Sequence, residues 1–378
     1  MEPGFYKNND FLEIYAYDKV HFTQRSSCVV SVVPLCETKK LCYLRFMSSE
    51  SLRKDLITRI ARVEEASFEA TALAVFRYQA EHNPLYAEFI RLIGIQPENV
   101  TRLANIPFLP IRLFKIHDLQ TAAWSPEAVF SSSGTTGQAT SRHFVRHLDW
   151  YLSCTKQGFE SFYGPVENYC MLALLPSYLE RSGSSLVTMA DYFIRLSRYE
   201  QSGFFLYDYE PLLERLAWCR QHSVPTLLLG VSFALLDLAE AHPTPLGDTV
   251  IMETGGMKGR REEVTRDVLH EKLKSAFGAT QIHSEYGMTE LLSQAYSKGD
   301  GLFRPSPTLR VLIRETSDPL SIERPGRPGA INLIDLANLD TLSFIATDDL
   351  GRGYADHSFE VLGRLDYSEV RGCNLMVM

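Results

Sequence analysis

Short apolar runs alternate with helical patterns along the middle of the chain, and this alternation constrains the fold more than any other feature of the sequence. Apolar runs of about four to eight residues indicate buried strands, and apolar residues spaced three and four positions apart indicate helices that cover a sheet. Strands are expected over Ala128–Phe130, Cys170–Leu175, Thr226–Gly230, Thr249–Met252 and Thr280–His283, and helices over Phe144–Phe159, Leu186–Leu196, Pro211–His222, Phe233–Ala241 and Arg261–Phe277. Because each helix carries the chain back to the start of the next strand, we predict an α/β domain with mainly parallel sheets flanked by helices.

The chain on either side of this alternation has other patterns. Ser49–His82 has a helical pattern among charged residues. The strand-like runs near the C-terminus, which predict a small β-rich lobe, are Thr308–Arg314, Ala330–Asp335, Leu342–Thr347 and Phe359–Leu362. We divide the chain into an N-terminal extension or small strand segment (1–46), an α/β core (47–300), the β-rich lobe of the same domain (301–366) and a C-terminal tail (367–378). Met47 is an alternative natural start, and the sequence leaves that choice open.

Charge and cysteine content exclude several classes of protein. The chain has 38 Lys and Arg against 46 Asp and Glu, a net charge of −8, which argues against nucleic acid as a partner. No apolar stretch approaches the length of a membrane span, and the N-terminus lacks the pattern of a signal peptide. None of the seven cysteines forms a Cys-x-x-Cys pair, which favours free thiols in a reducing compartment. We expect a cytoplasmic protein with neither a nucleic-acid partner nor a membrane span.

The densest chemical signal is Ser131–Gly137, with the sequence Ser-Ser-Ser-Gly-Thr-Thr-Gly, directly after the expected strand Ala128–Phe130. Glycines let backbone N–H groups turn toward an anion, and hydroxyl groups add further donors, so this composition is typical of a phosphate-binding loop. The alternative is an ordinary Ser/Gly surface loop. A Walker loop is excluded, because neither Gly-Lys-Ser nor Gly-Lys-Thr occurs in the chain.

Three later segments carry groups that suit a nucleotide. In Glu285–Glu290, a tyrosine can stack on a base, and a threonine hydroxyl and a glutamate carboxylate suit an α-phosphate and its Mg²⁺. Thr347–Gly351 is an acidic turn that suits ribose hydroxyls, and the arginine in Gly363–Asp366 suits a phosphate or a ribose. Each of these segments alone also fits an ordinary surface turn.

The order and spacing of the four segments resemble those of the adenylate-forming superfamily, which includes acyl-CoA synthetases, firefly luciferase and the adenylation domains of peptide synthetases. The resemblance covers about Phe108 to Asp366. Within the superfamily the chain is most similar to the acyl-protein synthetases of the fatty acid reductase of bacterial bioluminescence. This closer likeness is carried by the chain length, the Ser-Ser-Gly-Thr-Thr-Gly loop, Glu253–Gly259 and Arg371–Met376.

The resemblance implies an ATP-dependent attack of a carboxylate, that of a fatty acid, on the α-phosphorus, giving acyl-AMP and pyrophosphate, with ATP and Mg²⁺ as cofactors. The residues that would close over the β- and γ-phosphates are Ser132, Ser133, Gly134, Thr135, Thr136 and Gly137. The other implied contacts are adenine with Gly255, Gly256 and Tyr286, the α-phosphate with Thr289, Mg²⁺ with Glu290, ribose with Asp348, and ribose or phosphate with Arg364.

Two features depart from the superfamily pattern. A Pro-Lys pair usually follows the loop, but Ala139 and Thr140 stand there in this chain. The candidates to supply the missing charge are Arg142, His143 and Lys258. Only twelve residues follow Asp366, so we expect the mobile C-terminal domain and its catalytic lysine to be absent.

Cys373 is the candidate acyl acceptor. In the resembling family a cysteine near the C-terminus accepts the acyl group as a thioester and hands it to a reductase, and Arg371 is near enough in sequence to favour a thiolate. The alternative is an ordinary tail thiol. With Cys373, the expected catalytic residues are Thr289, Glu290 and Arg364, and the implied partners are an acyl-CoA reductase-like or acyl-carrier protein. Two other functions stay open: an aryl- or acyl-CoA ligase of the phenylacetate type, and a non-catalytic nucleotide-binding scaffold.

Overall fold

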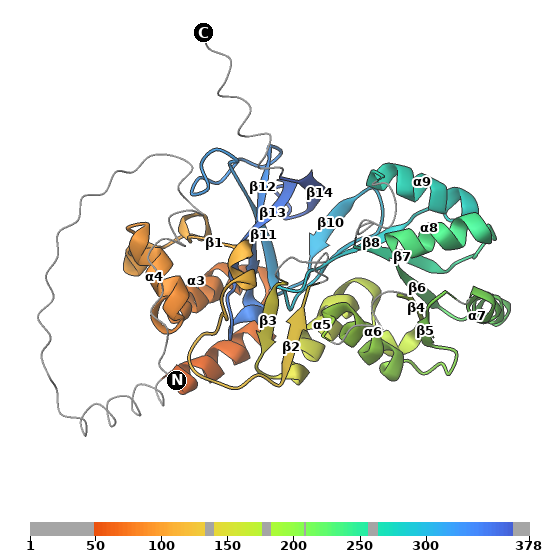
Figure 1. Ribbon diagram of the computed structural model, residues 1–378, viewed down its shortest axis with the longest axis horizontal. Coiled ribbons are helices and arrows are strands. Elements are labelled where there is room, and N and C mark those ends of the chain that lie inside the picture. Colours follow the sequence, from red (N-terminus) through yellow and green to blue (C-terminus); the bar gives the residue numbers. More distant parts are fainter. Residues whose placement is uncertain (1–48, 133–139, 176–182, 208, 256–263, 366–378) are drawn as a thin grey trace, which may run out of the picture.

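The computed structural model describes residues 49–132, 140–175, 183–207, 209–255 and 264–365 (Figure 1). The described chain begins with a helix over residues 49–61, followed by α3 (Glu65–His82) and α4 (Pro84–Leu92). Glu64 and Ser67 form a capping box at the start of α3, so the helical pattern expected over Ser49–His82 is divided into two helices there. Next come three 3₁₀ turns and a short strand: η1 (Pro97–Asn99), η2 (Leu103–Asn105), β1 (Leu109–Pro110) and η3 (Ile111–Lys115).

One sheet of twelve strands runs through the molecule. Eleven of them, in spatial order, are β11 (Leu309–Arg314), β12 (Pro328–Asp335), β13 (Phe344–Gly353), β14 (Phe359–Arg364), β10 (Leu302–Pro305), β9 (Ala295–Ser297), β8 (His283–Tyr286), β7 (Val250–Thr254), β6 (Thr226–Val231), β4 (Cys170–Leu174) and β5 (Gly203–Phe205). The strands from β5 to β8 are parallel, those from β8 to β11 are antiparallel, and β1 pairs with β13 in parallel. The strands β2 (Ala128–Ser131) and β3 (Arg142–Val145) form a separate hairpin.

Helices cover the parallel half of the sheet. They are α5 (Leu148–Tyr163), α6 (Ser185–Leu196), α7 (Tyr209–Gln221), α8 (Ser232–Ala241) and α9 (Arg266–Phe277), with the 3₁₀ turns η4 (Val166–Asn168) and η5 (Leu336–Asn338). Figure 1 shows α8 and α9 on one side of these strands and α5 and α6 on the other. Because both faces are covered, β4 and β6 are buried along their whole length, as the apolar runs predict. The described residues contain no helix that is both long and apolar enough to cross a membrane.

The apolar core consists of two clusters. One lies between the parallel strands and the helices α5 to α9, and it includes Leu228 and Phe233. The other joins α3 and α4 to the antiparallel strands, and it includes Phe76, Tyr286 and Phe344. The expected α/β core with a β-rich lobe is confirmed, and the lobe continues the same sheet.

Several expected elements have other bounds. The helix expected over Phe144–Phe159 starts too early, because residues 142–145 pair with β2 as strand β3. The strand expected over Thr280–His283 is displaced, because pairing with β7 begins only at His283. The turn expected over Thr347–Gly351 is part of β13, which is paired with β12 and β14 on its two sides. The helix expected from Arg261 begins at Arg266 in the described residues, after Thr265 as its N-cap.

A cluster of four charges anchors the helix over 49–61. Arg53 donates from Nε and Nη2 to the two carboxylate oxygens of Asp340, at 2.5 and 2.6 Å. Arg146 donates to Glu50 at 2.9 Å and lies 3.4 Å from Asp340. The side chains of Arg53 and Asp340 are 8% and 9% exposed, so water does not compete for the pair. Loss of one member therefore leaves a buried charge without its main partner.

Arg53→Ala is expected to lower the free energy of unfolding by about 3 kcal/mol, because Asp340 keeps only the longer contact with Arg146. Urea unfolding measures this change. Arg59→Ala is the matched control on the same helix, since the ion pair of Arg59 with Asp55 is about half exposed and contributes less than about 1 kcal/mol. Equal losses in the two variants would contradict the role of the buried pair.

Candidate active site

Four of the parallel strands, β4, β6, β7 and β8, end at one edge of the sheet, which we call the carboxyl edge. In open α/β sheets, ligands bind outside the carboxyl ends of the strands. The turn with Thr289 and Glu290 follows β8 there, and Gly255 follows β7. Two of the segments predicted to contact a nucleotide therefore lie at the edge where the fold favours a ligand.

Tyr286 joins the end of β8 to the β-rich lobe. Its hydroxyl donates to Asp349 Oδ2 at 2.8 Å, and Asp349 Oδ1 lies 3.3 Å from Nε of Arg364. The tyrosine is 9% exposed, and its ring packs edge-on against Phe303 and Phe359. Burial, and then the charge of Asp349, raise the pKa of Tyr286 well above its ordinary value, so the phenol remains a donor. Three strands, β8, β13 and β14, are thus linked by one chain of polar contacts.

The side chain of Asp348 points away from the polar contacts that join Tyr286, Asp349 and Arg364. Neighbouring residues of a strand face opposite sides, and Asp348 forms an ion pair with Arg112 of η3, whose Nε lies 3.0 Å from Oδ2. Asp349 and Arg112 were both missed by the sequence analysis. Asp349 could have been found, because it is next to Asp348 in the Thr-Asp-Asp segment. Arg112 could not, because no feature of the nearby sequence indicates that η3 lies beside β13.

Glu290 is the most enclosed acidic group of the predicted site. It is 7% exposed, and burial raises the pKa of its carboxyl. A hydrogen bond from Ser141 and the positive charges of Lys115 and Arg364 oppose this effect. Glu290 therefore lies among groups that favour its anionic form, although it is shielded from water. Lys115, on η3, is a second basic residue that the sequence analysis missed.

The donor set around Glu290 suits Mg²⁺ held together with a substrate. Mg²⁺ is usually bound by one or two carboxylates plus substrate phosphates and water, rather than by a cage of protein ligands. In the described part of the chain no cluster of three His, Cys, Asp or Glu residues forms such a cage. A single carboxylate beside a hydroxyl, as in Glu290 and Ser141, fits the shared mode of binding.

Ser132 closes the base of the Ser/Thr/Gly loop. Its N–H donates to the carbonyl of Ser141 at 3.1 Å, and its hydroxyl accepts from the N–H of Ser141 at 2.9 Å. Ser141 also opposes the rise in the pKa of Glu290, so the base of the loop and this carboxylate lie near one another. Ser133, Gly134, Thr135, Thr136 and Gly137 lie outside the described residues.

Gly255 ends β7 with a φ of +69°, a conformation that favours glycine. Its carbonyl accepts from the hydroxyl of Ser232, the first residue of α8, and the same hydroxyl lies 3.1 Å from Glu253. Although burial favours a neutral Glu253, a hydrogen bond with His270 and the charge of Arg266 lower the pKa of that carboxyl. Gly256 lies outside the described residues.

The candidates for the missing positive charge have different surroundings. Arg142 is exposed and ion-paired with Asp118. His143 is fully buried, and burial lowers its pKa to about 4, so it is neutral at pH 7 and cannot supply the charge. Lys258 and Cys373 lie outside the described residues. The structure thus removes His143 from the candidates and adds Lys115.

The structure brings most described site residues together. Tyr286 and Arg364 meet at Asp349, and Ser132 is hydrogen-bonded to Ser141, which lies near Glu290. Thr289 is half-buried between Glu290 and the end of β8. Asp348 is next to this group but turns its side chain toward Arg112. Gly255 is separate from these contacts, on the neighbouring strand.

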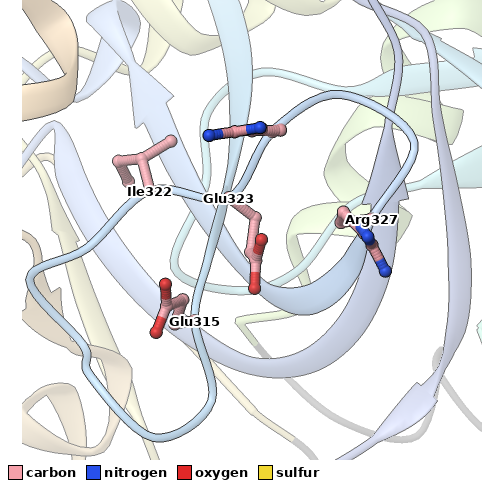
Figure 2. Close-up of a pocket in the computed structure, with 5 residues that line it drawn as sticks. Glu315, Ile322, Glu323 and Arg327 are labelled. Carbon is pink, nitrogen blue, oxygen red and sulfur yellow. The ribbon is translucent and has the colours of Figure 1, made fainter.

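Two hollows on the described surface are lined by residues other than those of the predicted site. One of about 350 Å³ lies on the loop between β11 and β12, where Glu323 stands between Glu315 and Arg327 (Figure 2). Another of about 570 Å³ lies between α8 and α9 and includes Leu236 and Lys272. Neither contains a predicted site residue, so neither enters the description of the site.

Comparison with known proteins gives the fold. No protein family model matches the chain, and no curated protein matches it in sequence. A solved structure of 2-hydroxyisobutyryl-CoA ligase, an open conformation in complex with 2-HIB-AMP and CoA, is similar with a TM-score of 0.60 at 14% identity, over 82% of this chain and 78% of that chain. The same ligase in the postadenylation state with 2-HIB-AMP gives 0.58 at 12%, over 80% and 69%.

ATP-bound MatB from Rhodopseudomonas palustris is a weaker match, with a TM-score of 0.48 at 14% identity. It covers 74% of this chain, and this chain spans about half of MatB, 52%. The similarity to 2-hydroxyisobutyryl-CoA ligase confirms the predicted α/β fold, with its sheet flanked by helices and its β-rich lobe.

The carboxyl of Glu285 gives a pH test of this site. Burial, reinforced by the charge of Glu253, raises its pKa from 4.5 to about 7, although the Thr254 hydroxyl donates to it. The native state therefore holds a proton that the unfolded chain has released, and this stabilisation, complete below pH 4.5, is lost as pH rises through 7.

Relative to Glu285→Gln, the wild type is expected to lose about 3 kcal/mol of unfolding free energy between about pH 4.5 and pH 8. Urea unfolding of the two proteins across this range measures the difference. The comparison with the variant removes the contributions of other titrating groups, such as Asp335, whose pKa burial also raises. Parallel curves for the two proteins would contradict the raised pKa.

Proposed function

We propose that this chain is an ATP-dependent ligase that activates a carboxylic acid as an acyl adenylate and passes the acyl group to a protein thiol. A carboxylate oxygen attacks the α-phosphorus of ATP, the bond from that phosphorus to the oxygen bridging to the β-phosphate breaks, and pyrophosphate leaves. A thiolate then attacks the acyl carbon, AMP leaves and a thioester forms. Both steps depend mainly on positioning and on stabilising the charge of the leaving group.

The observation that carries this proposal is the contact between the base of the Ser/Thr/Gly loop and the turn after β8: Ser132 is hydrogen-bonded to Ser141 directly before β3, and His143 of β3 lies 2.8 Å from the carbonyl of Thr289, next to Glu290. A group that can hold Mg²⁺ beside bound phosphates suits such a loop, and here β3 connects the base of the loop to the turn that carries Glu290. Arg364, near Glu290, adds an exposed guanidinium beside Asp349. Anion, metal and ribose contacts are therefore available within one group of residues.

Each predicted residue keeps its proposed role. We assign the β- and γ-phosphates to Ser132, Ser133, Gly134, Thr135, Thr136 and Gly137. We assign adenine to Gly255, Gly256 and Tyr286, the α-phosphate to Thr289, ribose to Asp348, and ribose or phosphate to Arg364. Glu290 would hold Mg²⁺, which when bound supplies electrostatic stabilisation of the leaving pyrophosphate. Arg112, already paired with Asp348, would orient that carboxylate toward the ribose.

The proposed acid is a fatty acid, as the sequence resemblance implies. The ligase with a similar fold carries 2-HIB-AMP, so short hydroxy acids belong in any substrate panel. We propose Cys373 as the first acyl acceptor, in the cytoplasm, where thiols stay reduced. An acyl-CoA reductase-like protein or an acyl-carrier protein would then take the acyl group.

A CoA ligase is the second candidate. One observation favours it: the solved ligase with a similar fold is in complex with CoA. The two candidates share the first step and differ in the acceptor, so the second step distinguishes them.

ATP–pyrophosphate exchange tests the first step. With Mg²⁺ present, exchange is expected only with certain acids of a panel that runs from acetate and 2-hydroxyisobutyrate to long-chain fatty acids and phenylacetate. Glu290→Gln is expected to lower the exchange rate at least about 100-fold, because it removes the charge proposed to hold the metal. Glu323→Gln, in the hollow of Figure 2, is the matched control and should keep the wild-type rate. ATP binding without exchange for any acid would contradict the proposal and favour the scaffold.

Cys373→Ala tests the second step. The variant is expected to keep exchange and to lose a hydroxylamine-labile acyl adduct, which the wild type forms with radiolabelled acid and ATP. Cys36→Ala, which removes another thiol, is the control and should keep the adduct. CoA-dependent release of AMP without any adduct in the wild type would instead support the CoA ligase.

A further inference from the structure

His143 is the second residue of β3, the strand that follows the Ser/Thr/Gly loop in the sequence, and it is fully buried. Both ring nitrogens are within hydrogen-bond distance of a partner. Nδ1 lies 2.8 Å from the carbonyl oxygen of Thr289, and Nε2 lies 2.9 Å from Oγ1 of Thr341. The ring also packs edge-on against Phe114 of η3, with centroids 5.7 Å apart.

These contacts determine which nitrogen carries the hydrogen. A carbonyl oxygen only accepts, so Nδ1 must be the donor to Thr289. A neutral ring then has a lone pair on Nε2, which accepts from the Thr341 hydroxyl. That hydroxyl has a competing acceptor in the carbonyl of Asn338, but at 3.4 Å this contact is longer. The neutral ring with hydrogen on Nδ1 therefore satisfies every polar atom in the contact.

Thr341, the partner of Nε2, is itself held by buried hydrogen bonds. The carbonyl of Thr341 accepts from Asn83 at 2.8 Å and from Thr121 at 2.6 Å, and these three residues are buried. Asn338 also donates to the carbonyl of Glu290 at 2.8 Å. Two consecutive carbonyls of the turn after β8, those of Thr289 and Glu290, are thus each held by a buried side chain.

We propose that His143 is a positioning residue of the active site, whose Nδ1–H holds the carbonyl of Thr289 and thereby orients the Thr289 hydroxyl and the Glu290 carboxylate. This inference rests on the proposed function. Because His143 belongs to β3, its contact with Thr289 joins that strand to the turn after β8. It acts through Thr289 and makes no contact with the reacting atoms.

Two amide substitutions of His143 distinguish its contact with Thr289 from its contact with Thr341. An asparagine amide reaches about as far as Nδ1, so His143→Asn can still donate to Thr289. A glutamine amide reaches about as far as Nε2, so His143→Gln keeps only the contact with Thr341. The proposal predicts that His143→Gln lowers kcat for ATP–pyrophosphate exchange at least about tenfold with KM for ATP within about threefold, and that His143→Asn recovers most of the loss.

Thr341→Val is the matched control, because it removes the partner of Nε2 and leaves Nδ1 and Thr289 unchanged. It is expected to lower thermal stability and to keep kcat within about twofold. A kcat loss in Thr341→Val as large as in His143→Gln, or a folded His143→Gln with wild-type kcat, would overturn the inference. Absence of exchange in the wild type would overturn the proposed function, and this inference with it.

Side-chain ¹⁵N NMR of the wild-type chain, labelled at histidine, tests the arrangement without relying on a variant that folds poorly. The His143 signal, assigned by its loss in either variant or by its shift in Thr341→Val, should show hydrogen on Nδ1 and a bare Nε2 at pH 7. Hydrogen on Nε2, or a doubly protonated ring, would overturn the inference.

Discussion

The arrangement of the site depends on the pairing of β10 with two strands. Arg304 and Pro305 pair with β9, while Leu302 and Phe303 pair with β14. Strand backbones must find hydrogen-bond partners, and here a four-residue strand provides them to both halves of the sheet. Through β10 the parallel half, which ends in Tyr286, is held next to the antiparallel lobe, which carries Asp349 and Arg364. If β10 paired with only one half, the residues of the candidate site would lie on two separate sheets.

Sequence patterns predicted the elements whose burial is uniform. Cys170–Leu174 and Thr226–Val231 are buried throughout and are mainly apolar, and such a run is visible without knowledge of its neighbours. The strand Arg142–Val145 was not predicted, and its last two residues were assigned to the following helix, because only the pairing with β2 makes these four residues a strand. β13 continues through two aspartates although its pairing with β12 is irregular there: regular pairing resumes at Leu350, and the Asp349 N–H donates to the Thr347 hydroxyl.

The same limit applies to the site. Tyr286, Glu290 and Arg364 could be selected from motif order because each belongs to a segment with a chemical signature. Arg112 and Lys115 have no such signature, since their role depends on η3 lying beside β13 and Glu290. His143 was selected for the wrong reason: a histidine in a basic segment suggests a charge, but complete burial makes it a neutral donor and acceptor. Local sequence indicates residue chemistry, and burial decides which form of the residue is present.

Asp349 and Arg364, which form an ion pair, differ in their exposure to solvent, and this difference has a consequence for ligand binding. The side chain of Asp349 is 12% exposed and that of Arg364 is 85% exposed, so the arginine is largely hydrated while it holds the aspartate. An ion pair of this exposed kind contributes less than about 1 kcal/mol. If Arg364 binds a phosphate or ribose as proposed, the ligand can replace Asp349 as the partner of the guanidinium at little cost, and Asp349 keeps the hydroxyl of Tyr286 as its donor. In the proposed site, Asp349 thus holds Arg364 before a ligand arrives, and the arginine can leave this contact when the ligand binds.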